Sequence, residues 1–303
     1  HRDLHSFPTR RSSDLITSSW AHVYSSQDML ILAEPANDWW WFWRNSDWDD
    51  ATNIHSFDIS EPGYTQYIGS GRVDGTVQDQ FSISEFEGSV RIASTSDAWA
   101  RWWLMDEVDE SGEPIWNGPT NQVSILQPNE EGELEQIGFI GSIAEGETIW
   151  SARFVADRGY LVTFENVDPL WVIDLSDPTN PVILGELEVP GVSTYIHPVN
   201  ENTLLTIGIG PGEDGLGLDW STTQISLFDI SDPTNPTLAD SLPISPVKVD
   251  ENCEDVRGCG WSWSWSEATY EHKAFTYWAP DDLLAVPLST YRYFYDQNDG
   301  YGG

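Results

Sequence analysis

One turn sequence recurs in this chain and limits what it can fold into. Residues 172–181 read VIDLSDPTNP, residues 227–236 read LFDISDPTNP, and residues 57–62 read FDISEP. In each copy an apolar, β-branched or aromatic run ends at an aspartate, and a proline then interrupts it. Proline lacks an amide hydrogen and has a fixed φ, so it cannot continue a central strand. Asp58, Asp174 and Asp229 can accept hydrogen bonds from the backbone that follows and so start a turn. The pattern predicts a strand–turn–strand unit, repeated along the chain.

Two further strand-like runs precede each of these units, joined by a short turn such as ADR or NEN. The repeating unit therefore has four strands, which we call A, B, C and D. Four complete units are expected at residues 20–71, 80–140, 148–189 and 192–244, and residues 268–290 read as the A–B hairpin of a fifth. No segment between the units has the pattern of a long amphipathic helix.

Four-stranded units in series, none able to bury its own faces, indicate a β-propeller. A β-sandwich array fits less well, because immunoglobulin-type domains need about seven strands per ~100 residues. Propellers close with about four to eight blades, and a lone terminal hairpin leaves an exposed strand edge. We therefore expect an all-β fold that is an incomplete open arc of a larger propeller, within residues 16–303.

The beginning of the chain does not resemble the rest. Residues 5–15 read HSFPTRRSSDL and resemble the translation of a common sequencing adapter. We interpret residues 1–15 as a non-native segment outside the fold, and expect any signal peptide of the natural protein to lie upstream. No run of about eighteen apolar residues is present, so no membrane-spanning segment is expected.

The repeated segments also carry a family resemblance. The run QFSISEFEGSVRIAST, the long stretch from ARFVADRGYL to NTLLTIG, and the runs ISLFDISDPTNP and EATYEHKAFTYWAPDDLLAVPL resemble a prokaryotic family of secreted proteins. Its members have a C-terminal β-propeller domain distantly related to WD repeats. The resemblance covers residues 20–290 and implies a secreted or cell-envelope-attached protein. It implies no reaction and no catalytic residues.

Charge excludes one class of partner. The chain has 50 Asp and Glu residues against 13 Lys and Arg, a formal net charge of −37. Such a surface repels phosphate backbones, so no nucleic-acid partner is expected. A solvated acidic surface and a cation-binding surface both remain open.

Strand direction predicts where a ligand binds. Adjacent strands are antiparallel, so A–B and C–D turns emerge on one face and B–C and D–A connections on the other. The long insertions at residues 34–52, 96–120, 210–222 and 245–267 are all of the second kind, and they hold 13 of the 17 tryptophans. Elaborated loops on a rigid scaffold usually bind, although these residues could instead pack together as a cap. The candidate ligand-binding residues are Trp40, Trp41, Trp43, Trp102, Trp103, Trp220, Trp261, Trp263 and Trp265.

Other chemistry has weaker signals. Cys253 and Cys259 are expected to form a disulfide in an exported protein, with a metal site as the alternative. No cofactor is expected; the acidic runs at residues 106–113 and 296–300 leave calcium open, although neither has the ligand spacing of an EF-hand. His22, His197 and His272 are predicted on A strands around a central channel, where with Glu271 they could ligate a metal, and His55 on a C strand. Structural histidines are the commoner outcome.

No catalytic motif is present: neither G-x-S-x-G nor H-E-x-x-H occurs. We therefore predict an extracellular binding or scaffold module, with a protein or glycan partner at the tryptophan- and acid-rich face. The alternative is an extracytoplasmic hydrolase of glycans or esters, with or without a metal.

Overall fold

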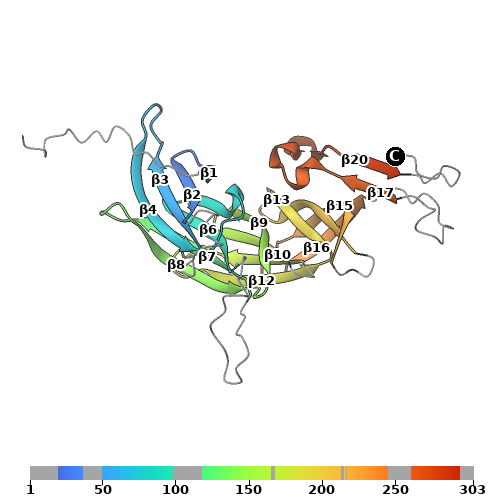
Figure 1. The fold of residues 1–303 in the computed structure, drawn as a ribbon, viewed down its shortest axis with the longest axis horizontal. Coiled ribbons are helices and arrows are strands. Elements are labelled where there is room, and N and C mark those ends of the chain that lie inside the picture. Colours follow the sequence, from blue (N-terminus) through green and yellow to red (C-terminus); the bar gives the residue numbers. More distant parts are fainter. Residues whose placement is uncertain are drawn as a thin grey trace, which may run out of the picture.

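The computed structural model describes residues 20–36, 50–97, 118–164, 168–212, 215, 217–244 and 261–293. These residues form antiparallel sheets that follow one another around an open arc, with no closed barrel (Figure 1). The first strands β1, β9 and β13 lie on the concave side of the arc, and β4, β8 and β12 lie toward its periphery. The fold predicted from the repeats, a β-propeller arc of four-stranded blades, is confirmed.

Each of the first four sheets has four strands in sequence order. Sheet 1 comprises β1 (His22–Ser25), β2 (Met29–Pro35), β3 (Ala51–Asp58) and β4 (Gln66–Asp74). Sheet 2 begins with a short 3₁₀ turn and comprises η2 (Gln80–Ser82), β5 (Ile83–Phe86), β6 (Ser89–Ser96), β7 (Thr120–Pro128) and β8 (Leu134–Ile143). Sheet 3 comprises β9 (Thr148–Val155), β10 (Arg158–Phe164), β11 (Asp168–Asp174) and β12 (Val182–Val189). Sheet 4 comprises β13 (Val192–Asn200), β14 (Thr203–Pro211), β15 (Leu218–Asp229) and β16 (Thr237–Ile244).

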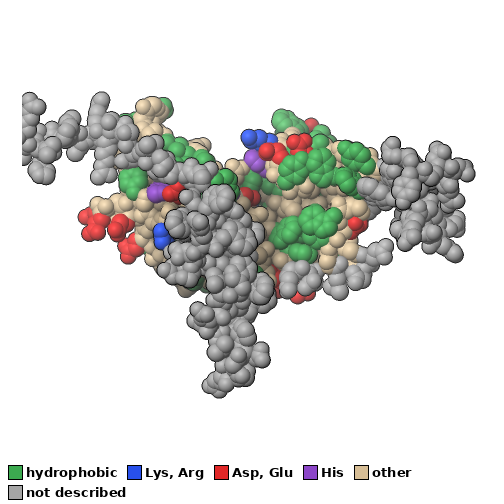
Figure 2. Space-filling model, viewed as in Figure 1, with side chains coloured by type: hydrophobic (Ala, Val, Ile, Leu, Met, Phe, Trp, Pro, Cys, Tyr) green, Lys and Arg blue, Asp and Glu red, His purple; other side chains and the backbone are tan. Residues whose placement is uncertain are grey.

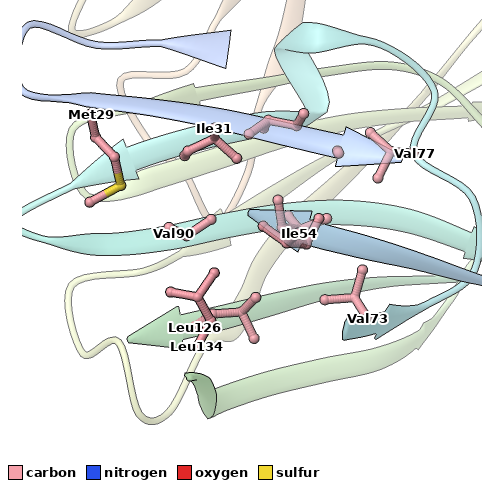
Figure 3. Packing of buried hydrophobic residues seen from close by; sticks show 11 residues of the cluster. Met29, Ile31, Ile54, Val73, Val77, Val90, Leu126 and Leu134 are labelled. Carbon is pink, nitrogen blue, oxygen red and sulfur yellow. The ribbon is translucent and has the colours of Figure 1, made fainter. Parts of the chain in front are cut away.

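The hydrophobic cores lie between successive sheets. Ile31 and Ile54 of sheet 1 pack on Val90 and Leu126 of sheet 2, as Figure 3 shows. Side chains alternate between the two faces of a strand, so a strand covered on both faces reads as a continuous apolar run. In β10, for example, Leu161 belongs to the core shared with sheet 2, whereas its neighbours on either side belong to the core shared with sheet 4.

Backbone hydrogen bonds show that the A–B and C–D turns share one face. In three sheets the residue after the turn aspartate donates its N–H to a carbonyl in the A–B turn of the same sheet. These bonds are Ile59 to Asp28 (2.9 Å), Leu175 to Asp157 (2.8 Å) and Ile230 to Asn202 (2.9 Å). The predicted side-chain bonds are also present. The carboxylates accept from the N–H two residues on, at 2.8 Å for Asp58, 3.0 Å for Asp174 and 2.9 Å for Asp229.

The recurring turn also joins neighbouring sheets. Each C–D turn lies against a glycine in the outer strand of the preceding sheet, so closely that a Cβ would meet backbone. A Cβ at Gly69 would lie 3.0 Å from the carbonyl oxygen of Gly132, at Gly138 2.0 Å from that of Pro178, and at Gly185 2.5 Å from that of Pro233. The three glycines occupy equivalent positions beside a β-bulge. In sheets 3 and 4 the recurring turn therefore forms both the edge of its own blade and the contact with the preceding one, and in sheet 2 a turn of different sequence makes the same contact.

The segment after sheet 4 differs from the sequence expectation. Residues 261–265, assigned to a connection, instead form β17 (Trp261–Trp265), which pairs with β20 (Ser289–Tyr293). The predicted inner strand contains two 3₁₀ turns, η4 (Glu267–Thr269) and η5 (His272–Ala274). They form because the side chains of Ser266 and Glu271 accept N–H groups at their starts. The expected hairpin is short: β18 (Thr276–Trp278) and β19 (Leu283–Ala285) pair across η6 (Ala279–Asp281).

Within the described part of the chain, no helix has the length and apolar character needed to cross a lipid bilayer.

The turn aspartates give the fold a specific acid sensitivity. Hydrogen bonds from the side chain and then the backbone of Thr179 lower the pKa of Asp177, and those of Thr234 do the same for Asp232. Because the pKa of each carboxyl is lower in the folded protein than in the unfolded chain, these hydrogen bonds stabilise the fold fully at pH values above the unfolded pKa. That stabilisation is lost as the pH falls through the folded pKa. Asparagine still accepts these bonds but does not titrate. In the double variant Asp177→Asn, Asp232→Asn, we expect the free energy of unfolding to fall less than in the wild type as the pH drops below ~3.8. Urea midpoints measured across the acid range check this.

The control for this pair is Glu201→Gln, which removes a carboxylate from the neighbouring A–B turn. The structure shows no hydrogen bond to the Glu201 carboxylate within the described residues. An acid dependence of the double variant equal to that of the wild type would contradict the expectation.

Candidate functional site

The structure describes only some of the predicted ligand-binding residues. Trp40, Trp41, Trp43, Trp102 and Trp103 lie outside the described residues, as do Cys253, Cys259 and the acidic runs at 106–113 and 296–300. The backbone of Trp261 begins β17. Trp220, Trp263 and Trp265 are described with their side chains.

In strand β17 the described serine, Ser264, is buried, whereas Trp263 and Trp265 are exposed. Serine and tryptophan alternate along it, and the alternation of strand side chains separates them onto two faces. Ser264 is buried: its hydroxyl accepts the N–H of Thr223 at 3.2 Å and contacts the carbonyl oxygens of Ser221 and Ile244. Ser266 is also buried and donates to the carbonyl of Pro287 at 2.7 Å. The other face is left to the tryptophans.

Trp263 and Trp265 form an exposed aromatic surface together with two tyrosines. Each indole keeps 40% of its surface exposed. Trp263 packs edge-on against Tyr291, its cross-strand partner, with ring centroids 5.5 Å apart. Trp265 stacks on Tyr270 at 5.6 Å and 24°. We call these four residues the aromatic platform. Aromatic pairs of this kind favour edge-to-face and offset-stacked arrangements and so help to hold each ring in place.

Trp220 lies in β15, and the ring contact described for it is with Trp150 rather than with the platform. It precedes Ser221, whose carbonyl contacts Ser264 in β17, and it is 69% exposed. Its ring centroid lies 6.1 Å from that of Trp150, which packs on Phe164 at 5.6 Å. The structure therefore brings Trp263 and Trp265 together on one surface, whereas the ring contact described for Trp220 is with Trp150 of sheet 3. Figure 2 shows hydrophobic side chains gathered over the C-terminal segment.

The histidines are placed differently from one another. His22 lies in β1, His197 in β13 and His55 in β3, as predicted. His272 was predicted on a strand and instead lies in η5, because the carboxylate of Glu271 caps that turn. Among the residues that the structure describes, no group of three or more His, Cys, Asp or Glu side chains is arranged to hold a metal ion.

Aromatic contacts converge near the concave centre. The Phe81 ring lies 5.3 Å from Tyr195 and 4.9 Å from His272, and the Arg153 guanidinium lies over it at 4.8 Å. The Gln80 amide contacts both ring nitrogens of His272, at 3.2 and 3.3 Å. Nothing in the spacing of these residues along the sequence indicates that they meet, because they come from four separate parts of the chain, η2, β9, β13 and η5.

Burial lowers the pKa of two of the histidines. Desolvation lowers the pKa of His22, partly offset by Asp79 and by the 3.2 Å contact of its Nε2 with the Val77 carbonyl. Desolvation also lowers the pKa of His197, with a further contribution from Arg153. Both imidazoles are therefore favoured in their neutral forms.

Sheet 1 contains a serine–histidine–glutamate chain that sequence motifs did not reveal. Ser70 Oγ lies 2.5 Å from Nδ1 of His55, and Nε2 of His55 lies 3.4 Å from Glu34. The Tyr67 hydroxyl donates to Ser70 at 2.7 Å. The register places Ser70 directly opposite His55, so a period-two alignment of these strands could have found the pair.

Comparison with known proteins defines the class to which this fold and surface belong. The sequence profile described as Beta propeller domain matches residues 3–303, and the chain therefore belongs to that family. The match begins within the segment interpreted as non-native, and that interpretation stays a prediction.

Two archaeal relatives are similar to most of this chain. An uncharacterized protein of Methanocaldococcus jannaschii is 32% identical over 247 residues, covering 82% of this chain and 31% of the relative. An uncharacterized protein of Archaeoglobus fulgidus is 29% identical over 259 residues, covering 84% and 34%. The chain spans about a third of the length of the curated relatives it matches.

Proposed function

We propose that this chain is a binding module that acts outside the cytoplasm, and that the aromatic platform contacts its ligand. The observation that carries the proposal is that Ser264 and Ser266 are buried, whereas Trp263 and Trp265, which alternate with them, are exposed. A tryptophan row that only filled a core would be covered, whereas Trp263 and Trp265 each keep 40% exposure. Elaborated connections on a rigid scaffold are the usual place for a ligand. Fold by itself would not justify this conclusion, since propellers host many functions.

A protein with a basic surface is the ligand that the chemistry favours. Tryptophan and tyrosine are the residues most enriched at the centres of protein interfaces. The net charge of −37 attracts a cationic partner and accelerates encounter with it. The location outside the cytoplasm rests on the resemblance to secreted proteins and on the expected disulfide.

The hydrolase alternative has one observation in its favour, the chain of contacts from Ser70 through His55 to Glu34. Acyl transfer also needs N–H donors aimed at the developing oxyanion. The N–H of Ser70 is instead donated to the carbonyl of Gly132 at 3.2 Å. We therefore favour binding, with this chain of contacts as a cross-strand hydrogen-bond network.

Replacing Trp263 and Trp265 together with serine is expected to abolish ligand retention. Each truncated anchor costs about 2 kcal/mol if it is a hot spot, so the affinity falls about a hundredfold or more. The immobilised protein is exposed to the extracellular protein fraction of a producing culture and, in parallel, to a glycan array. Captured proteins are identified by mass spectrometry at low and high salt, and basic proteins released by salt are expected.

The matched control is Trp278→Ser, which removes an exposed tryptophan outside the platform. Circular dichroism checks that both variants fold. Equal retention by the wild type and the double variant would refute the proposal. Unfolding of the double variant would show that the tryptophans are a structural cap, and binding confined to the glycan array would replace the protein ligand with a sugar.

A further inference from the structure

A second candidate site lies at the concave centre of the arc; of the four residues of the aromatic platform, Tyr270 also lines it. A cavity of about 400 Å³ is lined there by β1, η2, β13 and the C-terminal turns, including Phe81, Tyr195, His272 and Lys273. A neighbouring cavity of about 330 Å³ is lined by Arg153 and Ser84. The two cavities share Val23, Gln80 and Phe81. Together they have the size typical of small-molecule sites.

Two basic residues line these cavities, although basic residues are rare in the chain. Only 13 of 303 residues are Lys or Arg, yet Arg153 and Lys273 both line the cavities. Within the described residues, neither lies within ion-pair distance of a carboxylate. Figure 2 shows basic and histidine side chains on the part of the C-terminal segment that faces the gap in the arc.

The two carboxylates of the cavity are already engaged. Asp79 accepts the N–H groups of Phe81 and Ser82 at 2.8 and 3.1 Å, and burial raises its pKa, which favours its neutral form. The carboxylate of Glu271 accepts the N–H of Lys273 at 3.1 Å and lies 3.5 Å from Nδ1 of His272. Both carboxylates therefore have local hydrogen-bond partners, while among the residues that the structure describes neither cation has a carboxylate partner.

The stacking of Arg153 prepares it to bind an anion. Its guanidinium lies over the Phe81 ring, and its N–H donors lie in the guanidinium plane, so the edge that binds a carboxylate bidentately is not used by the stack. Within the described residues no hydrogen bond from this guanidinium occurs. The Phe81 ring and Tyr195 form an apolar surface beside the guanidinium.

We propose that the central cavities bind a small organic anion, with a carboxylate held by Arg153, a second polar or anionic group near Lys273, and the body of the ligand against Phe81 and Tyr195. The residues that carry this proposal, Arg153 and Lys273, differ from those that carry the aromatic platform, Trp263 and Trp265, so either proposal can fail alone although Tyr270 borders both sites.

The test uses the whole chain and measures binding of citrate, succinate and glucuronate by isothermal titration calorimetry at constant ionic strength. Xylitol is the uncharged comparison. At least one of the three anions is expected to bind with one-to-one stoichiometry. Arg153→Gln and Lys273→Gln are each expected to weaken binding about tenfold or more, because each removes a charge-assisted hydrogen bond.

The matched control is Arg72→Gln, which removes the same charge from β4, away from the cavities. Circular dichroism and the urea midpoint verify folding, and Lys273, being exposed, is the variant least able to disturb it. Unchanged affinity in both cavity variants, equal weakening by Arg72→Gln, or absence of binding by all three anions would each overturn the proposal.

Discussion

Replacing Gly138 with alanine is expected to lower the free energy of unfolding by about 2 kcal/mol, the magnitude typical of overpacking. A Cβ there would lie 2.0 Å from the carbonyl oxygen of Pro178, which belongs to the next sheet. Backbone cannot rotate out of the way as the end of a side chain can, so the two sheets must separate. Strand propensity alone predicts the opposite sign, because alanine is better than glycine in a strand by roughly 0.5–1 kcal/mol.

The fourth sheet supplies the control for this prediction. Asp240 occupies the position equivalent to Gly138 and Gly185 beside the bulge of β15 and β16. A Cβ is already present there, so Asp240→Ala is expected to change stability by less than about 0.5 kcal/mol. Urea unfolding followed by circular dichroism measures both. A Gly138→Ala protein as stable as the wild type would show that the inter-sheet contact is not tight.

Truncation of Phe228 to alanine is expected to lower the free energy of unfolding by about 3–5 kcal/mol. This side chain is 1% exposed and belongs to the core between sheets 3 and 4, with Tyr160, Val172 and Leu204. Its removal leaves a cavity between two sheets that are held apart by their other side chains, so collapse is limited. The urea midpoint should fall without a matching change in the slope of the transition.

Phe139→Ala is the same chemical change at a half-exposed position of β8, where 49% of the side chain is accessible. We expect this variant to lose well under half as much free energy of unfolding, because folding removes less apolar area from water at that position. Similar losses in the two variants would mean that the core between sheets 3 and 4 contributes no more than the surface of β8.

The local signals of the sequence were sufficient for the fold. Turn aspartates such as Asp174 and Asp229 accept hydrogen bonds from residues two positions further on, so their role can be predicted from the local sequence. Alternating or continuous apolar runs likewise report burial on one or both faces of a strand. The strand β17 was missed although its period-two alternation of serine and tryptophan is plain, because its pairing partner β20 follows only after 3₁₀ turns and a short hairpin.

The sequence by itself determined the blade repeat, the turn chemistry, the acidic charge and the face from which the long connections emerge. Those properties depend on contacts within a few residues or on composition. Only the tertiary structure decided which glycines must lack a side chain, which tyrosines pack on Trp263 and Trp265, and that Arg153, Phe81 and His272 converge at the concave centre. The physical reason is that these contacts join separate sheets, and their geometry follows from how the sheets pack rather than from any residue's neighbours along the chain.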